Sequence, residues 1–373
     1  MIDKKLPIIV VRCLIYIYEK QYACVRWGGT RSSSFDITNG TRQGSVLSPA
    51  AFGVYFDDLL KSLRKLGFGC HIAGKFFGAA LFADDLILMS PTRSGMQEML
   101  SHCEKYGTEH NIVFSTDPNP IKSKSKCLYM NGKKNNVTYP APVKLYGKPL
   151  PFVHDAVHLG NYLCEDVKTE HDAHLKRITF IDKSTSIREM FGFADPTNIL
   201  QAIQLYAGSA YGSTQWDLYG EKAGQYYRTW NTAVKLTWQV PRECHTYIVE
   251  NLLATEFKSF ATRIKTSYVN FFKRLLNSRS DEVRLLAQLT GRDATSTTGR
   301  NLRNIHLETG LDPWSSPSYQ IGDKLSQLVA PVPPQDLWRL EYLQKLLIKR
   351  YDMEVDVQET KNITKLIDSL CIN

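Results

Sequence analysis

The amino-acid sequence predicts an α+β chain in which a strand-rich first part precedes a helix-rich second part. Up to about residue 165, short apolar runs alternate with turn residues, and three segments carry the three- and four-residue apolar spacing of a helix. From about residue 167 onward, helical spacing predominates. A group of strands followed by a group of helices is typical of α+β proteins with separate domains.

Composition and charge narrow the class of protein. The chain has 373 residues, of which 43% are apolar, and its 46 Lys and Arg exceed its 37 Asp and Glu to give a net charge of +9. This charge favours polyanionic partners, although many basic proteins bind no nucleic acid. The eight cysteines contain no CxxC pair, and no apolar run is long enough to cross a membrane. We therefore expect an intracellular protein that is neither secreted nor bound to a membrane.

The first elements are expected to be a helix and a strand pair. Leu6 to Gln21 has helical apolar spacing, and the interruption of its apolar run by Arg12 argues against a signal peptide. Tyr22 to Trp27 and Phe35 to Thr38 alternate like strands, with a glycine- and serine-rich turn between them.

A second helix is predicted after the turn at residues 39–47. Ser48 suits its N-cap, Pro49 suits its first position, and an apolar stripe at three- and four-residue spacing continues to Leu63. Asp57 and Asp58 lie late in this helix, so we expect them to be a pair on its surface.

Phe76 to Ser90 consists of two apolar runs separated by Asp84 and Asp85, which predicts two short strands joined at an acidic tip. Arg93 to Glu109 is predicted to be a helix. Further strands are expected at residues 112–114, 127–130, 145–152 and 156–163, and the weakest order at residues 290–300 and 310–335, where Gly, Ser and Pro cluster.

The acidic tip is the first candidate site. Adjacent carboxylates repel each other unless a cation lies between them, and Mg²⁺ supplies that charge with one or two carboxylates plus substrate phosphates. Phosphoryl-transfer enzymes use two such ions, one at the attacking oxygen and one at the leaving oxygen. A solvated acidic turn is the alternative for Asp84 and Asp85 when they are taken alone.

A second motif makes the assignment of a phosphoryl-transfer site more specific. It lies about forty residues before the acidic tip and reads Thr41-Arg-Gln-Gly-Ser-Val-Leu-Ser-Pro49. Gly44 lets the backbone approach a base or sugar closely, and Arg42 and Gln43 offer donors to phosphates and base edges.

Together these segments closely resemble the conserved boxes of reverse transcriptases. The motifs Val25-Arg-Trp-Gly28, Asn39-Gly-Thr-Arg-Gln-Gly-Ser-Val-Leu-Ser-Pro49, Phe82-Ala-Asp-Asp85 and His158-Leu-Gly-Asn-Tyr-Leu163 are similar to those of the non-LTR, or LINE-type, retrotransposon branch. The resemblance covers about residues 6–163 well and the helical remainder loosely.

The resemblance implies an architecture. Residues 1–165 would form a partial right-hand polymerase palm, an antiparallel sheet with packed helices, and residues 166–290 a helical thumb-like region. Residues 291–373 would be a helical C-terminal extension. In the helical part, basic side chains interleave with aromatic ones, which suits either a surface for a template–primer duplex or an aromatic core with solvated charges.

The resemblance also implies roles for single residues. Asp84 and Asp85 would be the catalytic metal ligands for two Mg²⁺ ions, and Lys122 would protonate the pyrophosphate leaving group. The nucleotide and template pocket would be lined by Arg42, Gln43, Gly44, Ser45, Phe82 and Ala83, and a primer-grip-like hairpin would be formed by His158, Leu159 and Gly160. The expected partners are an RNA template, a DNA primer or target, and deoxynucleotides. Lys122 in a solvated basic loop and 158–160 in a purely structural hairpin are the alternatives.

One part of the family pattern has no counterpart in this sequence. The first carboxylate box should precede Leu6, and Asp3 lacks the apolar strand that would carry it. The sequence therefore predicts an amino-terminally truncated RNA-directed DNA polymerase with little or no activity. A catalytically inactive nucleic-acid-binding remnant is the alternative, and an intron maturase fits the motifs less well. The oligomeric state is left open.

Overall fold

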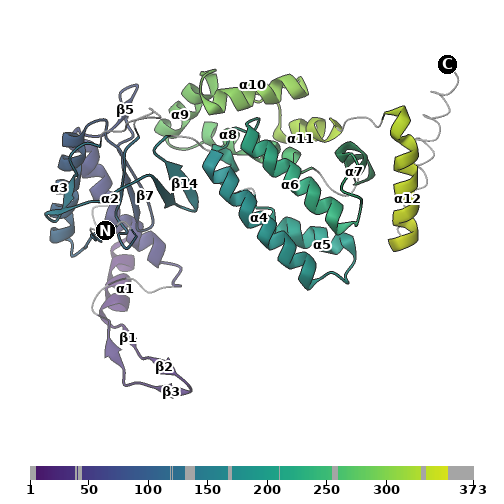
Figure 1. Cartoon of the computed structure of the whole chain (residues 1–373). Helices are drawn as coiled ribbons and strands as arrows, with labels where there is room; N and C mark the ends of the chain where they lie inside the picture. The colour runs from purple at the N-terminus through teal and green to yellow at the C-terminus, as the bar shows by residue number, and fades with distance from the viewer. Residues whose placement is uncertain are drawn as a thin grey trace. The chain divides into compact units, whose positions relative to one another are not determined.

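The computed structural model describes residues 6–37, 40, 44–117, 119, 121–130, 139–166, 170–209, 211–253, 259–328 and 333–351 (Figure 1). The chain divides into two compact units. Unit 1 comprises Met1–Cys127 and Thr138–Val153, and unit 2 comprises Leu128–Val137 and His154–Asn373. The mixture of helices and small antiparallel sheets confirms the α+β class, whereas the palm, thumb and extension boundaries remain predictions.

Unit 1 begins with the predicted helix and strand pair. Helix α1 spans Ile8–Glu19. Four two-residue strands follow: β1 (Tyr22–Ala23), β2 (Arg26–Trp27), β3 (Thr30–Arg31) and β4 (Phe35–Asp36). Strand β1 pairs with β4 and β2 with β3, all antiparallel. The inner pair turns at Gly28 and Gly29, which have φ values of 53° and 86° that few other residues adopt.

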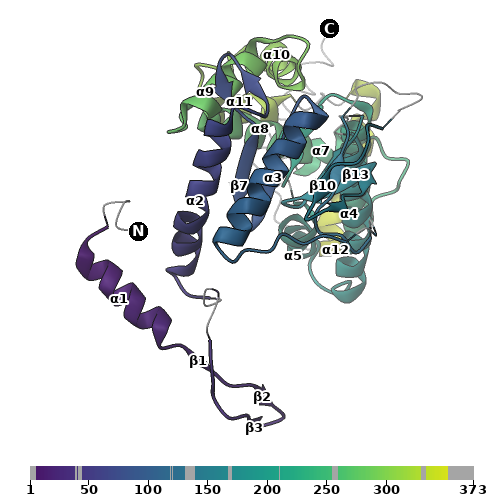
Figure 2. The same cartoon turned by 90° about the vertical axis from the view of Figure 1, so that its left-hand side faces the viewer.

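The core of unit 1 lies between two helices and a hairpin, which Figure 2 shows side by side. Helix α2 spans Ser48–Leu66 and α3 spans Arg93–Glu109, and the hairpin consists of β7 (Ala79–Phe82) and β8 (Asp85–Leu88). Phe56, Leu59 and Leu63 of α2 meet Met99 and Cys103 of α3 in this core. The three- and four-residue spacing of these apolar side chains is what makes both helices amphipathic and buries one face of each.

The ends of these helices follow from local chemistry. Helix α2 begins at Ser48, so Pro49 is its second residue and the expected N-cap position is one residue too late. It ends at Gly67, whose φ of 80° closes the last turn. The hydroxyl of Thr92 accepts a hydrogen bond from the backbone N–H of Gly95 and caps α3.

Short strands complete unit 1. They are β5 (His71–Ile72) paired with β6 (Lys75–Phe76), β9 (Cys127–Leu128), β10 (Lys144–Leu145) paired with β11 (Lys148–Pro149), and β12 (Phe152–Val153). The strand expected at Ile112–Phe114 is absent. The backbone N–H of Ile112 instead donates to the carbonyl of Gly107 at 2.8 Å. The side chains of Ile112 and Phe114 pack against the α2–α3 core.

Unit 2 opens with one hairpin and is otherwise helical, as the sequence predicts. The hairpin is β13 (Asp155–His158) and β14 (Asn161–Cys164). The helices are α4 (Glu170–Met190), α5 (Pro196–Ala202), the π-helix η2 (Ile203–Ala207), η3 (Ser213–Gln215), α6 (Glu221–Thr237), α7 (Thr246–Leu253), α8 (Phe260–Leu276), α9 (Asp281–Arg292), α10 (Thr297–Thr309), α11 (Ser318–Gln327), η4 (Pro334–Asp336) and α12 (Leu337–Tyr351).

The core of unit 2 is aromatic. Helices α4 and α6 lie side by side, and Phe180, Tyr226 and Trp230 pack with Phe260 of α8 (Figure 1). The rings of Trp230 and Phe260 stack at 5.1 Å between centroids. Tyr226 and Trp230 of α6 therefore belong to the core, and the half-buried Tyr227 packs against it.

The segment at residues 290–300 is more regular than the sequence predicts. Helix α9 continues to Arg292, and Ser296 caps α10 by accepting a hydrogen bond from the N–H of Gly299 at 2.8 Å. The expectation of weak order there was wrong, because a serine four residues after the end of one helix begins the next. None of the helices in the described part of the chain is long and apolar enough to cross a membrane.

Candidate functional site

The acidic tip is a two-residue turn between β7 and β8. The register pairs Phe82 with Asp85, so that Ala83 and Asp84 form the turn itself. Ala83 has a φ of 51°, in the left-handed region that few residues with a Cβ atom adopt. The predicted arrangement of two strands meeting at the carboxylates is therefore present.

The two faces of this hairpin differ. Leu81 and Leu86 are paired across the strands and pack on the α2–α3 core, together with Ala79 and Leu88. Because side chains alternate along a strand, Phe82 and Asp85 lie on the opposite face. Phe82 is 65% exposed, and both Asp84 and Asp85 are exposed. The apolar face anchors the hairpin, while its carboxylates remain open to solvent and to a ligand.

The second acidic pair of unit 1 is a surface pair, as expected. Asp57 lies on α2 with an ion pair from its carboxylate to Nζ of Lys61 at 2.6 Å, and Asp58 lies 3.8 Å from the same ammonium. These helical spacings let Lys61 offset part of the negative charge of the pair.

The segment before α2 is only partly described. Gly44 has a φ of 80° and is exposed. The hydroxyl of Ser45 accepts a hydrogen bond from the N–H of Leu47 at 3.3 Å and leads the chain into α2. Arg42 and Gln43 lie outside the described residues, so their predicted contact with nucleotide or template stays a prediction. Helix α2 packs against β7, so the described end of this segment is tied to the acidic hairpin through one core.

Lys122 projects from a tight turn. The backbone carbonyl of Asn119 accepts hydrogen bonds from the N–H groups of Lys122 and Ser123 at 3.1 and 2.8 Å. Ser123 is buried, whereas Lys122 is exposed. The turn thus holds the backbone while the ammonium group is free to reach a phosphate, and its predicted role as an acid stays a prediction.

The hairpin at residues 158–160 belongs to unit 2. Strand β13 pairs with β14 so that His158 faces Asn161, and Leu159 and Gly160 form the turn with φ values of 48° and 71°. Two successive positive φ values match the right-handed twist of a two-residue hairpin.

A polar network holds this turn from behind. The hydroxyl of Tyr211 donates to the carbonyl of Leu159 at 2.6 Å, and Nζ of Lys176 donates to the carbonyl of Tyr211 at 2.7 Å. Lys176 forms an ion pair with Asp172 at 3.1 Å. Asp172 is 1% exposed and accepts hydrogen bonds from the indole N–H of Trp216 at 2.6 Å and the N–H of Tyr162 at 3.2 Å.

Sequence reasoning did not single out Asp172. The spacing of four residues to Lys176 on one helix face was the available signal, and such pairs usually lie in solvent. Only the burial of this carboxylate and its bond to a distant tryptophan distinguish it.

The described part of the chain contains no group of three or more His, Cys, Asp or Glu side chains arranged to hold a metal ion. Mg²⁺ nevertheless takes as few as one or two protein carboxylates and completes its shell with water and substrate phosphates. The adjacent, exposed carboxylates of Asp84 and Asp85 fit that requirement.

Comparison with known proteins agrees with this geometry. Residues 3–139 match the family model described as "Reverse transcriptase (RNA-dependent DNA polymerase)". This part of the chain is similar to reverse transcriptase domains. The matched residues include the acidic hairpin, the segment before α2 and the Lys122 turn, but they end before the hairpin at residues 158–160.

The similar proteins belong to retrotransposable elements. The chain is 29% identical over 134 residues to the Pol polyprotein of a type-1 retrotransposable element R2 from Nasonia vitripennis. It is 36% identical over 83 residues to that of the type-2 element R2DM from Drosophila melanogaster, and 27% identical over 136 residues to that of a type-1 element R1 from Bradysia coprophila. The predicted resemblance to LINE-type enzymes is confirmed.

The matches cover a limited part of each protein. They span 36%, 22% and 35% of this chain and 13%, 8% and 12% of the three relatives. The chain thus corresponds to a small portion of the Pol polyproteins that it resembles.

Proposed function

We propose that the chain is part of an RNA-directed DNA polymerase that joins deoxynucleotides to a primer by two-metal nucleotidyl transfer. The observation that carries the proposal is the β7–β8 hairpin, which packs one face on the α2–α3 core and leaves Asp84 and Asp85 exposed at its tip. A metal-dependent site requires carboxylates that are exposed to the ligand and held in place by a well-packed element.

Asp84 and Asp85 would hold the divalent cations, with Asp84 at the turn and Asp85 at the start of β8. Mg²⁺, when bound there, supplies positive charge to the attacking and leaving oxygens. The reaction joins the 3′-hydroxyl oxygen of the primer to the α-phosphorus of the nucleotide and breaks the bond from that phosphorus to pyrophosphate. The hydroxyl proton passes to water, and the leaving pyrophosphate oxygen accepts a proton from a nearby acid.

Other residues would position the substrates. The exposed backbone at Gly44 offers close approach to a base or sugar, next to donors at Arg42 and Gln43. Phe82 and Ala83 flank the carboxylates, and Lys122 is an exposed ammonium in the same domain that could protonate the pyrophosphate. The hairpin at His158, Leu159 and Gly160 would support the primer.

Primer extension tests this function. The whole chain is incubated with an RNA template, an annealed DNA primer, deoxynucleotides and Mg²⁺, and the extended primer is measured. We expect little product, because two carboxylates hold a divalent cation weakly, and we expect Asp84→Asn to lower it by about 100-fold or more. The matched control is Asp57→Asn with Asp58→Asn, which makes the same change in the acidic pair on α2 and should leave the product unchanged.

The result separates two functions. Product that persists in the Asp84→Asn variant would contradict the proposal. A chain that makes no product but binds an RNA–DNA hybrid would favour the second candidate, an inactive nucleic-acid-binding remnant, for which the net charge of +9 is the supporting observation.

A further inference from the structure

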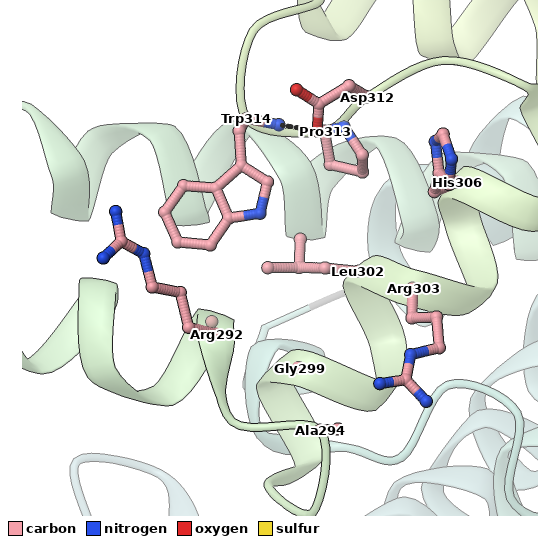
Figure 3. A pocket seen from close by; sticks show the side chains of 10 residues that line it. Arg292, Ala294, Gly299, Leu302, Arg303, His306, Asp312, Pro313 and Trp314 are labelled. Carbon is pink, nitrogen blue, oxygen red and sulfur yellow. Dashed lines mark hydrogen bonds between the residues drawn. The ribbon is translucent and has the colours of Figure 1, made fainter.

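A cavity of about 300 Å³ lies in unit 2 between the end of α9, helix α10 and the loop that follows it (Figure 3). Its lining is formed by Gly291, Arg292, Ala294, Gly299, Leu302, Arg303, His306, Asp312, Pro313 and Trp314. The volume is at the lower end of the range for small-molecule sites and is enough for one flat ring system. None of these residues takes part in the site described above.

The inner part of the cavity is apolar. Leu302 is 2% exposed and Pro313 is buried. Trp314 is half-buried and is held by Phe272, whose ring lies perpendicular at 5.0 Å between centroids. Gly291 makes this packing possible, because a Cβ atom there would lie 2.8 Å from the indole and 2.8 Å from Phe272. The indole is therefore fixed in place as a wall of the cavity.

The rim supplies hydrogen-bond donors and positive charge. Arg292 and Arg303 are exposed, and a guanidinium group can only donate. His306 donates from Nδ1 to the carbonyl oxygen of Leu311 at 3.0 Å, so Nε2 of the neutral ring is an acceptor at this rim. In Figure 3 the guanidinium groups of Arg292 and Arg303 lie on opposite sides of Trp314 and Leu302.

One acid also lines the cavity, and it is already engaged. The carboxylate of Asp312 accepts hydrogen bonds from the backbone N–H of Trp314 at 3.1 Å and from the hydroxyl of Ser315 at 2.8 Å. Burial alone would raise the pKa of this carboxyl group, but these bonds and the nearby His306 hold its pKa below the usual value. The carboxylate oxygens of Asp312 already accept hydrogen bonds from its own loop. The groups that remain for a ligand are therefore mainly the two guanidinium groups, which are donors and carry positive charge.

From this combination we propose that the cavity binds one nucleotide of a single-stranded nucleic acid, with the base against the half-buried Trp314, which the buried Leu302 and Pro313 back, and the flanking phosphates on Arg292 and Arg303. A flat apolar wall beside cations is the arrangement with which proteins hold single strands. Guanidinium groups on opposite sides of the apolar wall suit the two phosphates that flank one base of a strand. The choice of nucleic acid as the ligand rests on the proposed function.

Binding is measured with the whole chain and a fluorescein-labelled single-stranded oligonucleotide by anisotropy, in EDTA so that no catalysis is involved. We expect Arg292→Gln with Arg303→Gln to weaken binding about tenfold and to reduce the slope of log affinity against log salt by about 1.4, for two lost phosphate contacts. The matched control is Arg274→Gln with Arg279→Gln, two exposed arginines of the same unit outside the cavity. It should change the affinity less than twofold.

Cross-linking gives a second readout that does not depend on a variant. An oligonucleotide carrying 5-iodouracil is irradiated with the wild-type chain, and the modified peptide is identified by mass spectrometry. We expect modification at His306 or Trp314. Cross-links confined to other segments, or equal affinities of the two double variants, would overturn the proposal, and full competition by a mononucleotide at equal concentration would overturn the assignment to a strand.

The proposed polymerase function and the proposed nucleotide-binding cavity can be tested independently of each other. Asp84→Asn should abolish primer extension and leave oligonucleotide binding unchanged. Primer extension without cavity-dependent binding would remove only the inference about Arg292 and Arg303, whereas cavity-dependent binding without Asp84-dependent synthesis would remove only the proposed polymerase function.

Discussion

At the scale of single residues, environment separates side chains that look alike in the sequence. Asp57 and Asp58 share the ammonium group of Lys61 on α2, whereas Asp84 and Asp85 are exposed at a strand turn. Asp172 shows a third environment, because it is buried and its oxygens are shared among Trp216, Tyr162 and Lys176. A carboxylate is thus a surface charge, a candidate ligand or a structural anchor according to its neighbours.

Asp172 should be important for the stability of unit 2. Asp172→Ala leaves the indole N–H of Trp216 and the ammonium of Lys176 without their partner, and breaking a largely buried pair in this way costs about 3 kcal/mol. The exposed Asp182 of the same helix serves as the control, and Asp182→Asn should change the free energy of unfolding by less than about 0.5 kcal/mol. Urea denaturation followed by circular dichroism measures both, and equal values would show that the network contributes nothing to stability.

At the scale of elements, several tight hairpins have the same backbone conformation in their turns. The turns Ala73-Gly74, Tyr146-Gly147 and Leu159-Gly160 each have two positive φ values, with glycine in the second place. This geometry matches the twist of the flanking strands. The acidic turn departs from it, since Asp84 occupies the second place and only Ala83 has a positive φ. The carboxylate thus stands where the other turns have glycine.

Substitution of Gly160 should cost more than substitution of Gly310, where a Cβ atom has nothing within 4 Å. Gly160→Ala places a Cβ atom 3.3 Å from Cε1 of Tyr211, which is itself held by its bond to Leu159. Gly310 has a similar φ of 69° with nothing within 4 Å, so Gly310→Ala isolates the backbone strain. We expect losses of about 1 kcal/mol for Gly310→Ala and about 2 kcal/mol for Gly160→Ala, measured by thermal unfolding. Equal losses would mean that Tyr211 moves aside without cost.

At the scale of the whole molecule, the chain combines two compact units with a net charge of +9. The core of unit 1 is small, whereas the core of unit 2 is larger, and both contain aromatic rings among aliphatic side chains. Exposed aromatic side chains of unit 2, among them Phe193, Tyr206 and Trp338, are available to a nucleic acid, and the net charge of +9 adds an electrostatic contribution to its affinity.

Binding of an RNA–DNA hybrid by the whole chain should therefore depend steeply on salt. Each phosphate neutralised by Lys or Arg releases counterions, so we expect the affinity to fall by at least about tenfold between roughly 50 and 200 mM salt. Anisotropy titrations at several salt concentrations give the slope. An affinity that is constant over this range would contradict an electrostatic mode of binding.

The sequence by itself determined the helices, the acidic hairpin and the family, because apolar periodicity and adjacent motif residues are local properties. The helix at Arg93–Glu109 has the predicted bounds, and the strands meet at Asp84 and Asp85 as expected. Only the tertiary structure decided which face of the hairpin is open, that Asp172 anchors the turn at Leu159, and that Arg292, Arg303 and Trp314 surround one cavity. These features depend on contacts between residues far apart in the chain, and neither spacing nor residue type records such contacts.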